Sequence, residues 1–524
     1  MNLDVENLPE DPSELKEIIA TQSKNYQDKI EHLEQYIRLL KNEIFGSKSE
    51  KRPRPDDKQV PLFDEFETIV DETAEAKEEE KVAVPAHSRA KRGRKPLPAD
   101  LPREDIVHDI SDAEKNCTCG ARCECIGQEV SEKLVYVPAE LKVERHIRLK
   151  YACRECEGVE DDGPTVKIAP VPAQLIPKGV ATSGLVAQIV TSKFEDALPL
   201  YRQEKIFSRL GIDLSRATMA GWMIKVADRA GPILQLFENE IRSGPFVNID
   251  ETPVQVLNEP DRPNTSKSYM WIFRGGDPDH PSLVYRYHPS RAGQVPLQFL
   301  NDYKGFVQTD GYNGYEALGR QSGITLVGCW YHARRKFSAV IKAKAHPNKQ
   351  HNAEKALDYI GQLYAIEKQA RKQQLNAEQI RELRQQKAQP VLDEFKDWLD
   401  QTIVTTPPKG LLGKAVNYTL KFWKRLIRYV DDGRLRPDNN LAENAIRPFV
   451  VGRKNWLFSA HPNGAAASAA LYSIIETAKA NELKPYFYLR YLFDNLPFAQ
   501  TEADFKNLLP QYVDSAALAD AAPR

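Results

Sequence analysis

The sequence lacks long apolar runs and lacks an excess of charge of either sign. No stretch approaches the roughly 20 consecutive apolar residues of a membrane-spanning helix, so we predict a protein without a membrane segment. The 73 lysines and arginines nearly balance the 74 aspartates and glutamates, so only local charge can indicate a nucleic-acid partner. The acidic start lacks the basic and then apolar order of a secretory signal, which predicts a cytoplasmic protein.

Cysteine is scarce and unevenly placed. In a reducing compartment a cysteine cluster favours a metal site over disulfides. Cys153 and Cys156 have the two-residue gap that lets both sulfurs reach one tetrahedral zinc ion, Zn²⁺. The other group has one-residue gaps, so the spacing leaves its best pair open; we expect Cys117 and Cys119, with ordinary buried thiols as the alternative. Six of the seven cysteines form this cluster: Cys117, Cys119, Cys123, Cys125, Cys153 and Cys156.

At 524 residues the chain exceeds one ordinary core of about 150 residues, so we expect several modules. Within residues 1–50, a helix is expected to start at Asp11. Apolar residues then recur at spacings of three and four positions. This pattern predicts a coiled-coil oligomerisation helix that joins copies of the chain. The alternative is an amphipathic helix that packs on its own domain. The apolar positions are Ile19, Tyr26, Ile30, Leu33, Ile37, Leu40 and Ile44.

Residues 51–98 are charged and rich in proline, a composition typical of a linker. Within them, Arg92 and Arg94 flank a glycine as in an AT-hook, whose arginines enter the minor groove of A/T-rich DNA. A solvated tether is the alternative. Residues 99–165 follow as the zinc-binding module.

Residues 166–240 predict a helical DNA-binding domain. Helices are expected over Ser183–Lys193 and Ala197–Leu210, and Ser215 is expected to cap a third helix that begins at Arg216. A helix, a tight turn with glycine and a capped helix form the helix-turn-helix pattern. Arg216 would then face the major groove of DNA, unless the segment is a plain helical bundle.

Residues 241–345 predict the first part of a mixed α+β core. Three antiparallel strands followed by alternating helices and strands is the order of an RNase H-like sheet. Residues 346–430 read as a helical insertion that supports the site or contacts DNA, residues 431–480 complete the core, and 481–524 form a tail. The expected strands are Phe246–Asp250, Ser268–Arg274, Ser282–Tyr287, Gly305–Asp310 and Ile324–Trp330.

Three acidic residues are the candidate catalytic residues. Asp250 and Asp310 each come at the expected end of a strand, and Glu443 lies in the second part of the core. Phosphoryl transfer from DNA needs metal ions that stabilise the attacking and leaving oxygens. Mg²⁺, or Mn²⁺, prefers hard oxygen ligands, which three carboxylates supply. The trio therefore predicts a catalytic metal site, although aspartates at strand ends often serve only as caps.

Basic and polar residues surround this trio along the chain. Asn439 or Asn440 can cap a helix that presents Glu443 one turn later, and Arg447 and Arg453 on that helix are placed to hold phosphates.

A second basic run follows Cys329. Arg334, Arg335 and Lys336 are expected to contact phosphates. Cys329 and His332 form either half of a metal site or a wall of the active site. Zinc is not favoured there, because no second ligand pair is near in the sequence.

The runs NIDETPVQV, QTDGYNGYEAL, GCWYHARRKF and PDNNLAENAIRPFVVGRKNWLF, with IFGSKSEKR and the tail around LFDNLPFAQTEADF, resemble the insertion-sequence-sixty-six family of transposases. The resemblance implies an Asp, Asp, Glu (DDE) triad at Asp250, Asp310 and Glu443, the same residues to which the chemistry points. It also implies assistance from small accessory proteins of the same element. We therefore expect a nucleoid-associated DNA transposase that binds double-stranded element ends and target DNA. The rivals are an RNase H-like junction nuclease and an inactive zinc-containing DNA-binding regulator.

Overall fold

The computed structural model describes residues 11–45, 105, 141–152, 166–343, 352–513 and 518. The chain separates into two units, residues 59–171 and the remainder. Within the smaller unit, strands β1 (Lys150–Ala152) and β2 (Val166–Ile168) pair antiparallel, with Lys150 opposite Ile168. The expected zinc ligands Cys117, Cys119, Cys153 and Cys156 lie outside the described residues, as do Arg92 and Arg94 of the basic motif.

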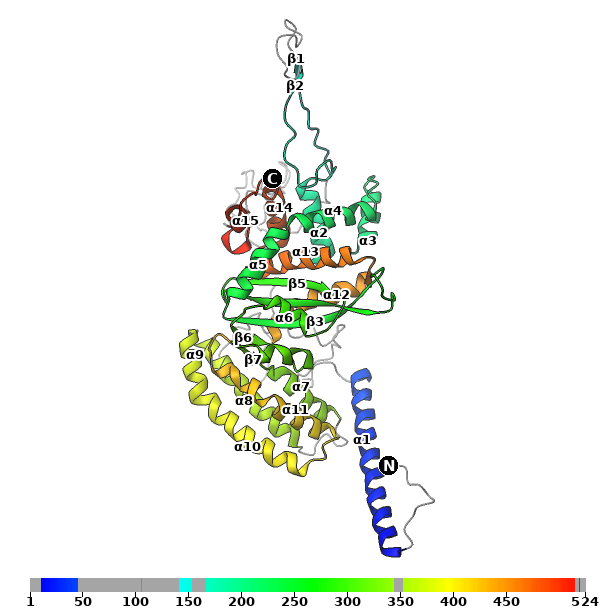
Figure 1. Ribbon diagram of the computed structural model, residues 1–524, viewed down its shortest axis with the longest axis vertical. Coiled ribbons are helices and arrows are strands. Elements are labelled where there is room, and N and C mark those ends of the chain that lie inside the picture. The colour runs from blue at the N-terminus through cyan, green and yellow to red at the C-terminus, as the bar shows by residue number, and fades with distance from the viewer. Residues whose placement is uncertain are drawn as a thin grey trace, which may run out of the picture. The chain divides into compact units, whose positions relative to one another are not determined.

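The larger unit is built on a mixed sheet with the order β5-β4-β3-β6-β7, and β8 pairs with the far end of β3. β3, β4 and β5 are antiparallel neighbours, whereas β6 and β7 run parallel to β3. Figure 1 shows strands β3 to β7 of this sheet in green. Its strands are β3 (Phe246–Val256), β4 (Lys267–Gly276), β5 (Pro281–His288), β6 (Gly305–Gln308), β7 (Ile324–Val327) and β8 (Phe458–Ser459).

Three strand boundaries correct the sequence prediction. β6 ends at Gln308, two residues before Asp310. β3 does not end at Asp250 but continues to Val256, because its second half pairs with β4 and buries Val254 and Val256. β7 ends at Val327, and helix α7 (Trp330–Lys342) begins where a strand was expected. Asp250 therefore lies in the middle of a long strand.

Alternate residues of β4 face opposite sides of the sheet. Phe273 stacks on Phe299 of helix α6 (Gln294–Phe299), and Trp271 meets Tyr315 of the 3-10 helix η3 (Asn313–Arg320) edge to face. Helices α5 (Gly231–Ser243) and α13 (Pro462–Ala480) lie on the other side of the sheet in Figure 1.

Helix α13 also seals the outer edge of β5. The backbone N–H of Leu283 donates to Oγ1 of Thr477 at 3.0 Å, and this hydroxyl donates back to the carbonyl of Leu283 at 3.1 Å. The N–H of Tyr285 donates to Oγ of Ser473 at 2.8 Å. Backbone groups that an edge strand would offer to another chain are thus satisfied internally.

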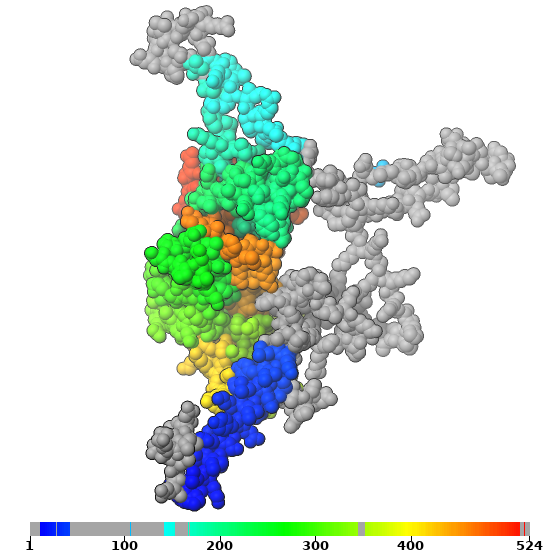
Figure 2. Space-filling model, turned by 90° about the vertical axis from the view of Figure 1, so that its right-hand side faces the viewer, coloured from blue at the N-terminus to red at the C-terminus, as the bar shows by residue number. Residues whose placement is uncertain are grey.

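The predicted helical region before the sheet is confirmed as helices α2 (Ser183–Phe194), α3 (Leu200–Arg209) and α4 (Arg216–Arg229). The hydroxyl of Ser215 accepts the N–H of Thr218 at 3.2 Å, as expected of a helix cap. Arg216 is exposed at the start of α4. Figure 2 shows residues of these helices directly against the segment 440–480.

Residues between α7 and the last part of the core are helical: α8 (Asn352–Lys372), α9 (Ala377–Leu383), the short π-helix η4 (Arg384–Ala388), α10 (Gln389–Thr405), α11 (Leu411–Leu426) and the 3-10 helix η5 (Ile427–Val430). They share a second apolar core with α7, centred on Trp330, Phe337 and Phe395. The Arg384 side chain is 2% exposed and donates to the carbonyls of Tyr429, Asp432 and Leu435. It thereby fixes the chain that leads back to the sheet.

Helix α1 (Pro12–Phe45) begins where the sequence predicted, with Oδ1 of Asp11 accepting the N–H of Ser13 at 3.1 Å. Near its end, Nε of Arg38 donates to the carbonyl of Ala343 at 3.0 Å, and Tyr36 accepts a hydrogen bond from Lys414. Its apolar stripe faces away from these contacts, and each of these residues is more than half exposed: Ile19, Tyr26, Ile30, Leu33, Ile37 and Leu40.

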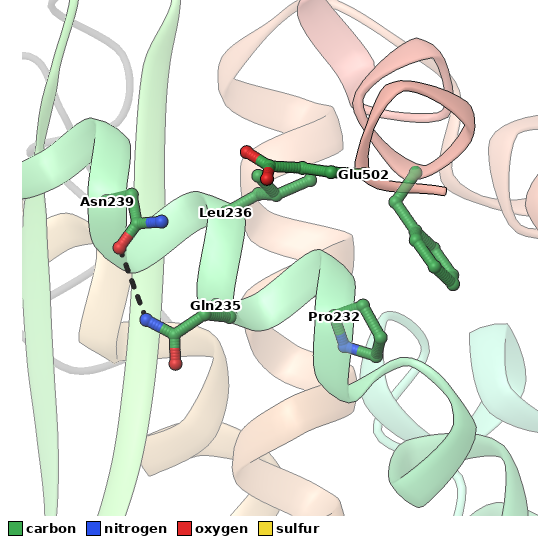
Figure 3. A pocket seen from close by; sticks show the side chains of 6 residues that line it. Pro232, Gln235, Leu236, Asn239 and Glu502 are labelled. Carbon is green, nitrogen blue, oxygen red and sulfur yellow. Dashed lines mark hydrogen bonds between the residues drawn. The ribbon is translucent and has the colours of Figure 1, made fainter. Parts of the chain in front are cut away.

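Of the C-terminal helices, α14 (Pro485–Asn495) packs against α2 and α15 (Glu502–Asn507) packs against α5. Between α15 and α5 lies an open hollow of about 270 Å³, which Figure 3 shows from close by. Pro232, Leu236 and Phe505 give it a largely apolar lining, so it offers little to a charged ligand. Among the described residues, no helix is long and apolar enough to cross a membrane.

Candidate active site

The strand register brings Asp250 and Asp310 together. β3 and β6 are parallel neighbours, and Asn248 stands opposite Gln308. Asp250 and Asp310 each follow two residues later, so both lie at the same level beside the carboxyl end of β6. Oδ1 of Asp250 accepts the N–H of Glu251 at 2.9 Å, and Oδ1 of Asp310 accepts the N–H of Tyr312 at 2.9 Å. These backbone bonds hold both carboxylates in place.

Helix α12 (Asn440–Trp456) brings Glu443 to the same place from 133 residues further along the chain. Glu443 raises the pKa of Asp250, as does Asp310, so the three carboxylates lie within electrostatic reach of one another. The sequence predicted this trio, and the structure brings it together.

A buried amide network anchors the start of α12 to the sheet. Nδ2 of Asn439 donates to the carbonyl of Ile249 at 2.9 Å, and Nδ2 of Asn248 donates to Oδ1 of Asn439 at 3.0 Å. Asn248 also donates to Gln308 at 2.9 Å, and Gln308 donates to the carbonyl of Arg436. Asn439 is the residue that precedes α12, but its side chain does not cap the helix as predicted; it binds β3 instead.

Asp250, Asp310 and Glu443 form a partly buried cluster of acidic groups, and the pKa values of Asp250 and Glu443 are raised. Burial and the neighbouring carboxylates Glu251, Glu443 and Asp310 raise the pKa of Asp250 well above its usual range. Burial, followed by Asp438 and Asp310, raises the pKa of Glu443 to about 7, although Arg335 opposes the shift. Since each ionised carboxylate disfavours the next, a divalent cation among these oxygens would relieve the repulsion.

Glu251 lies on the opposite face of β3 from Asp250 and was not predicted as a site residue. It pairs with Trp271 across the sheet, its side chain is 1% exposed, and it forms an ion pair with Arg291 at 2.5 Å. The hydroxyl of Tyr315 also donates to Glu251. This cluster fixes the backbone of Asp250 relative to η3. Glu251 is therefore a neighbour of the site with its charge already paired.

Cys329 and His332 meet Glu443 at the start of α7. Nδ1 of His332 lies 3.5 Å from Oε1 of Glu443, and Sγ of Cys329 lies 3.9 Å from the same oxygen. The N–H of Asn439 donates to Sγ at 3.2 Å. The sequence pointed to Cys329 and His332 but not to Glu443 as their neighbour, because that contact joins residues more than 100 positions apart.

The predicted phosphate-binding residues occupy two helices beside the carboxylates. Arg334, Arg335 and Lys336 lie on α7, and Arg335 and Lys336 are exposed. On α12, Arg447 is half-buried and interacts electrostatically with Glu443, while Nη1 of Arg453 donates to Thr252 at 3.2 Å. Positive side chains thus flank the site from two sides.

Basic residues near the end of the insertion form contacts within the chain. Arg425 forms an ion pair with Glu316 at 2.6 Å, Lys421 donates to Asn313, and Arg428 pairs with Asp431. The insertion also reaches the site itself, because the hydroxyl of Tyr364 donates to Asp438 at 3.0 Å.

Comparison with known proteins finds four matches along the chain. Residues 178–467 match the transposase IS66 family, and residues 114–157 match the zinc-finger binding domain of transposase IS66. Residues 32–106 match a region described as transposase C of IS166 homeodomain, and residues 473–511 match the IS66 C-terminal element.

Similar full-length proteins occur in Sinorhizobium fredii. The uncharacterized protein y4jD is 32% identical, over 97% of this chain and 98% of its own length. The uncharacterized proteins y4qI and y4hP are each 30% identical. The match to y4qI covers 93% of this chain and 90% of y4qI, and the match to y4hP covers 87% of this chain and 84% of y4hP. The extent of these matches, together with the match over the sheet and its carboxylates, shows that the chain belongs to the transposase IS66 family.

Proposed function

We propose that the protein is a DDE-type DNA transposase whose catalytic residues are Asp250, Asp310 and Glu443. The observation that supports the proposal is the register of β3 and β6, in which Asn248 lies opposite Gln308, two residues before Asp250 and Asp310. Glu443 on α12 and Asp310 both act electrostatically on Asp250. A sheet of this order, with helices on both faces and acids on adjacent central strands, supports an RNase H-like core.

The donor set fits Mg²⁺. Carboxylate oxygens are hard ligands, and the raised pKa values of Asp250 and Glu443 reflect a cluster of negative charge that a cation would balance. Bound there, Mg²⁺ would supply electrostatic stabilisation of the attacking and leaving oxygens of a phosphodiester. The side chains of Asp250, Asp310 and Glu443 would hold it.

The protein's own side chains would hold the DNA. Arg334, Arg335 and Lys336 on α7 and Arg447 and Arg453 on α12 flank the carboxylates, and guanidinium groups suit phosphate oxygens. Cleavage of each 3′ strand at the element ends would use water, and the freed 3′ hydroxyl would then attack target DNA.

DNA recognition would belong to other modules. Arg216 stands exposed at the capped start of α4, as the second helix of a helix-turn-helix requires. The AT-hook-like arginines Arg92 and Arg94 and the cysteine module with Zn²⁺ would add contacts to the terminal repeats. The exposed stripe of α1 would pair copies of the chain as a coiled coil. Small accessory proteins of the element would assist assembly.

The test is mobility in cells of a marked element with its native flanks and accessory genes. We expect movement with the wild type and none with Asp310→Asn. Asp302→Asn is the matched control, because Asp302 is an exposed aspartate just before β6 whose positive φ of 60° suits asparagine. Equal movement with Asp310→Asn and the wild type would refute the site.

A further inference from the structure

The cluster of Cys329, His332 and Glu443 has the composition of a transition-metal site. Their ligand atoms Sγ, Nδ1 and a carboxylate oxygen all lie within 4.8 Å of one another. A thiolate, an imidazole and one carboxylate, with water in the fourth position, form a typical tetrahedral set for Zn²⁺. Mg²⁺, by contrast, has no preference for sulfur.

The separations between the three ligand atoms are close to those found around a bound ion. In tetrahedral Zn²⁺ sites with bonds of about 2.0–2.3 Å, neighbouring ligand atoms stand roughly 3.3–3.8 Å apart. Here the two separations from Oε1 of Glu443 are 3.5 Å to Nδ1 of His332 and 3.9 Å to Sγ of Cys329. Rotation of the His332 and Glu443 side chains, which are 24% and 23% exposed, would close the remaining gap.

Two further observations favour a ligand over a closed hydrogen-bond cluster. Nδ1 of His332 is buried and has no hydrogen-bond partner within the described part of the chain, although it faces Glu443. The sulfur of Cys329 is 2% exposed and accepts the N–H of Asn439, a bond that stabilises a metal-bound thiolate. The N–H of Trp330 also donates to the carbonyl of Pro437 at 2.9 Å, so α7 and the start of α12 are fixed to each other.

We propose that Cys329, His332 and Glu443 bind one Zn²⁺ ion, and that this ion inhibits the enzyme by withdrawing Glu443 from the catalytic cation. On binding, the Cys329 thiol releases its proton to solvent as the Zn–S bond forms. The surrounding acids Asp250 and Asp310 add a negative field that favours the cation. The inhibitory half of the proposal rests on the proposed function; the binding half does not.

The binding test counts zinc in the full-length protein. Wild type, Cys329→Ala, His332→Asn and the control His280→Asn are loaded with Zn²⁺, dialysed against Mg²⁺ buffer and analysed for zinc per chain. His280 is exposed before β5, far along the chain from the cluster. We expect the wild type and His280→Asn to hold one more zinc per chain than the other two. Zinc in the cysteine module is common to all four proteins and cancels in the comparison.

Equal zinc in all four proteins would overturn the site. If Cys329→Ala loses its cooperative unfolding transition, His332→Asn, at a side chain that is 24% exposed, decides the result alone. Co²⁺ gives a second readout, since a sulfur-to-cobalt absorption band that depends on Cys329 is expected. These measurements need no DNA, so an inactive protein leaves their outcome intact.

The inhibition test measures DNA cleavage at fixed Mg²⁺ while Zn²⁺ is raised. The Zn²⁺ concentration that halves the initial rate of each protein should rise at least tenfold in Cys329→Ala. The same half-inhibiting concentration in both proteins would refute inhibition through this site.

Discussion

Replacing Glu443 by glutamine should stabilise the metal-free protein at pH 8 while it removes activity. The pKa of Glu443 is raised from 4.5 to about 7, chiefly by burial. A carboxyl whose folded-state pKa exceeds its unfolded value favours folding fully below the unfolded pKa and loses that contribution as pH rises through the folded pKa. Above pH 7 ionised Glu443 therefore costs stability. The cost is at most about 3.5 kcal/mol, because one pKa unit corresponds to about 1.4 kcal/mol.

Thermal unfolding in Mg²⁺-free buffer at pH 5 and pH 8 tests this expectation. Glutamine has the shape of the protonated acid, so Glu443→Gln should match the wild type at pH 5. At pH 8 its Tm should be several degrees higher, since about 1 kcal/mol shifts the Tm of a large domain by roughly 2–4 °C. The exposed Glu482→Gln is the control and should change nothing at either pH. The reasoning would be refuted if Glu443→Gln had a lower Tm than the wild type at pH 8. It would also be refuted if the change in Tm were the same at pH 5 and pH 8.

Three further changes test the packing around the site and the exposed helix. Asn439→Ala should lower the free energy of unfolding by about 2–4 kcal/mol in urea titration, because two buried hydrogen bonds are lost, whereas Asn440→Ala should cost less than about 1 kcal/mol. A double-mutant cycle between Arg425 and Glu316 should give a coupling energy of about 0.5–1 kcal/mol; zero coupling would mean that the insertion does not dock through this pair. If α1 pairs copies of the chain as proposed, the wild type should be an oligomer in light scattering and Leu33→Asp, at a residue that is 54% exposed on the stripe, should be a monomer; equal masses for the two proteins would exclude the coiled coil.

Local sequence patterns predicted the elements of the core well. The apolar and β-branched runs predicted the bounds of β4 and β5 to within one or two residues. The Ser215 cap predicted the first residue of α4. The carboxylates could be selected because two of them follow short buried runs of the kind that form central strands. These features depend on neighbours in sequence, which a single chain displays directly.

Contacts between distant segments were not predictable in the same way. The extension of β3 beyond Asp250 depends on pairing with β4, and the side chain of Asn439 leaves the helix start for a carbonyl 190 residues earlier. Glu251 gave no signal, because a second acid beside Asp250 reads as surface charge until Arg291 and Tyr315 are placed against it. Cys329 and His332 lacked a third ligand in sequence, and only the packing of α12 on the sheet brings Glu443 to them.

The sealing of β5 by α13 has a consequence for synthesis of the protein. Leu283 is made 194 residues before Thr477, the side chain that satisfies its backbone groups. At about 5–20 residues per second, a ribosome leaves this edge open for roughly 10–40 s. During that interval two nascent chains on one messenger could pair through β5, since an open strand edge is a template for another strand. A messenger cut short between codons 460 and 473 would make this exposure permanent, so the truncated copies should aggregate even though every strand of their sheet, β8 included, has been made.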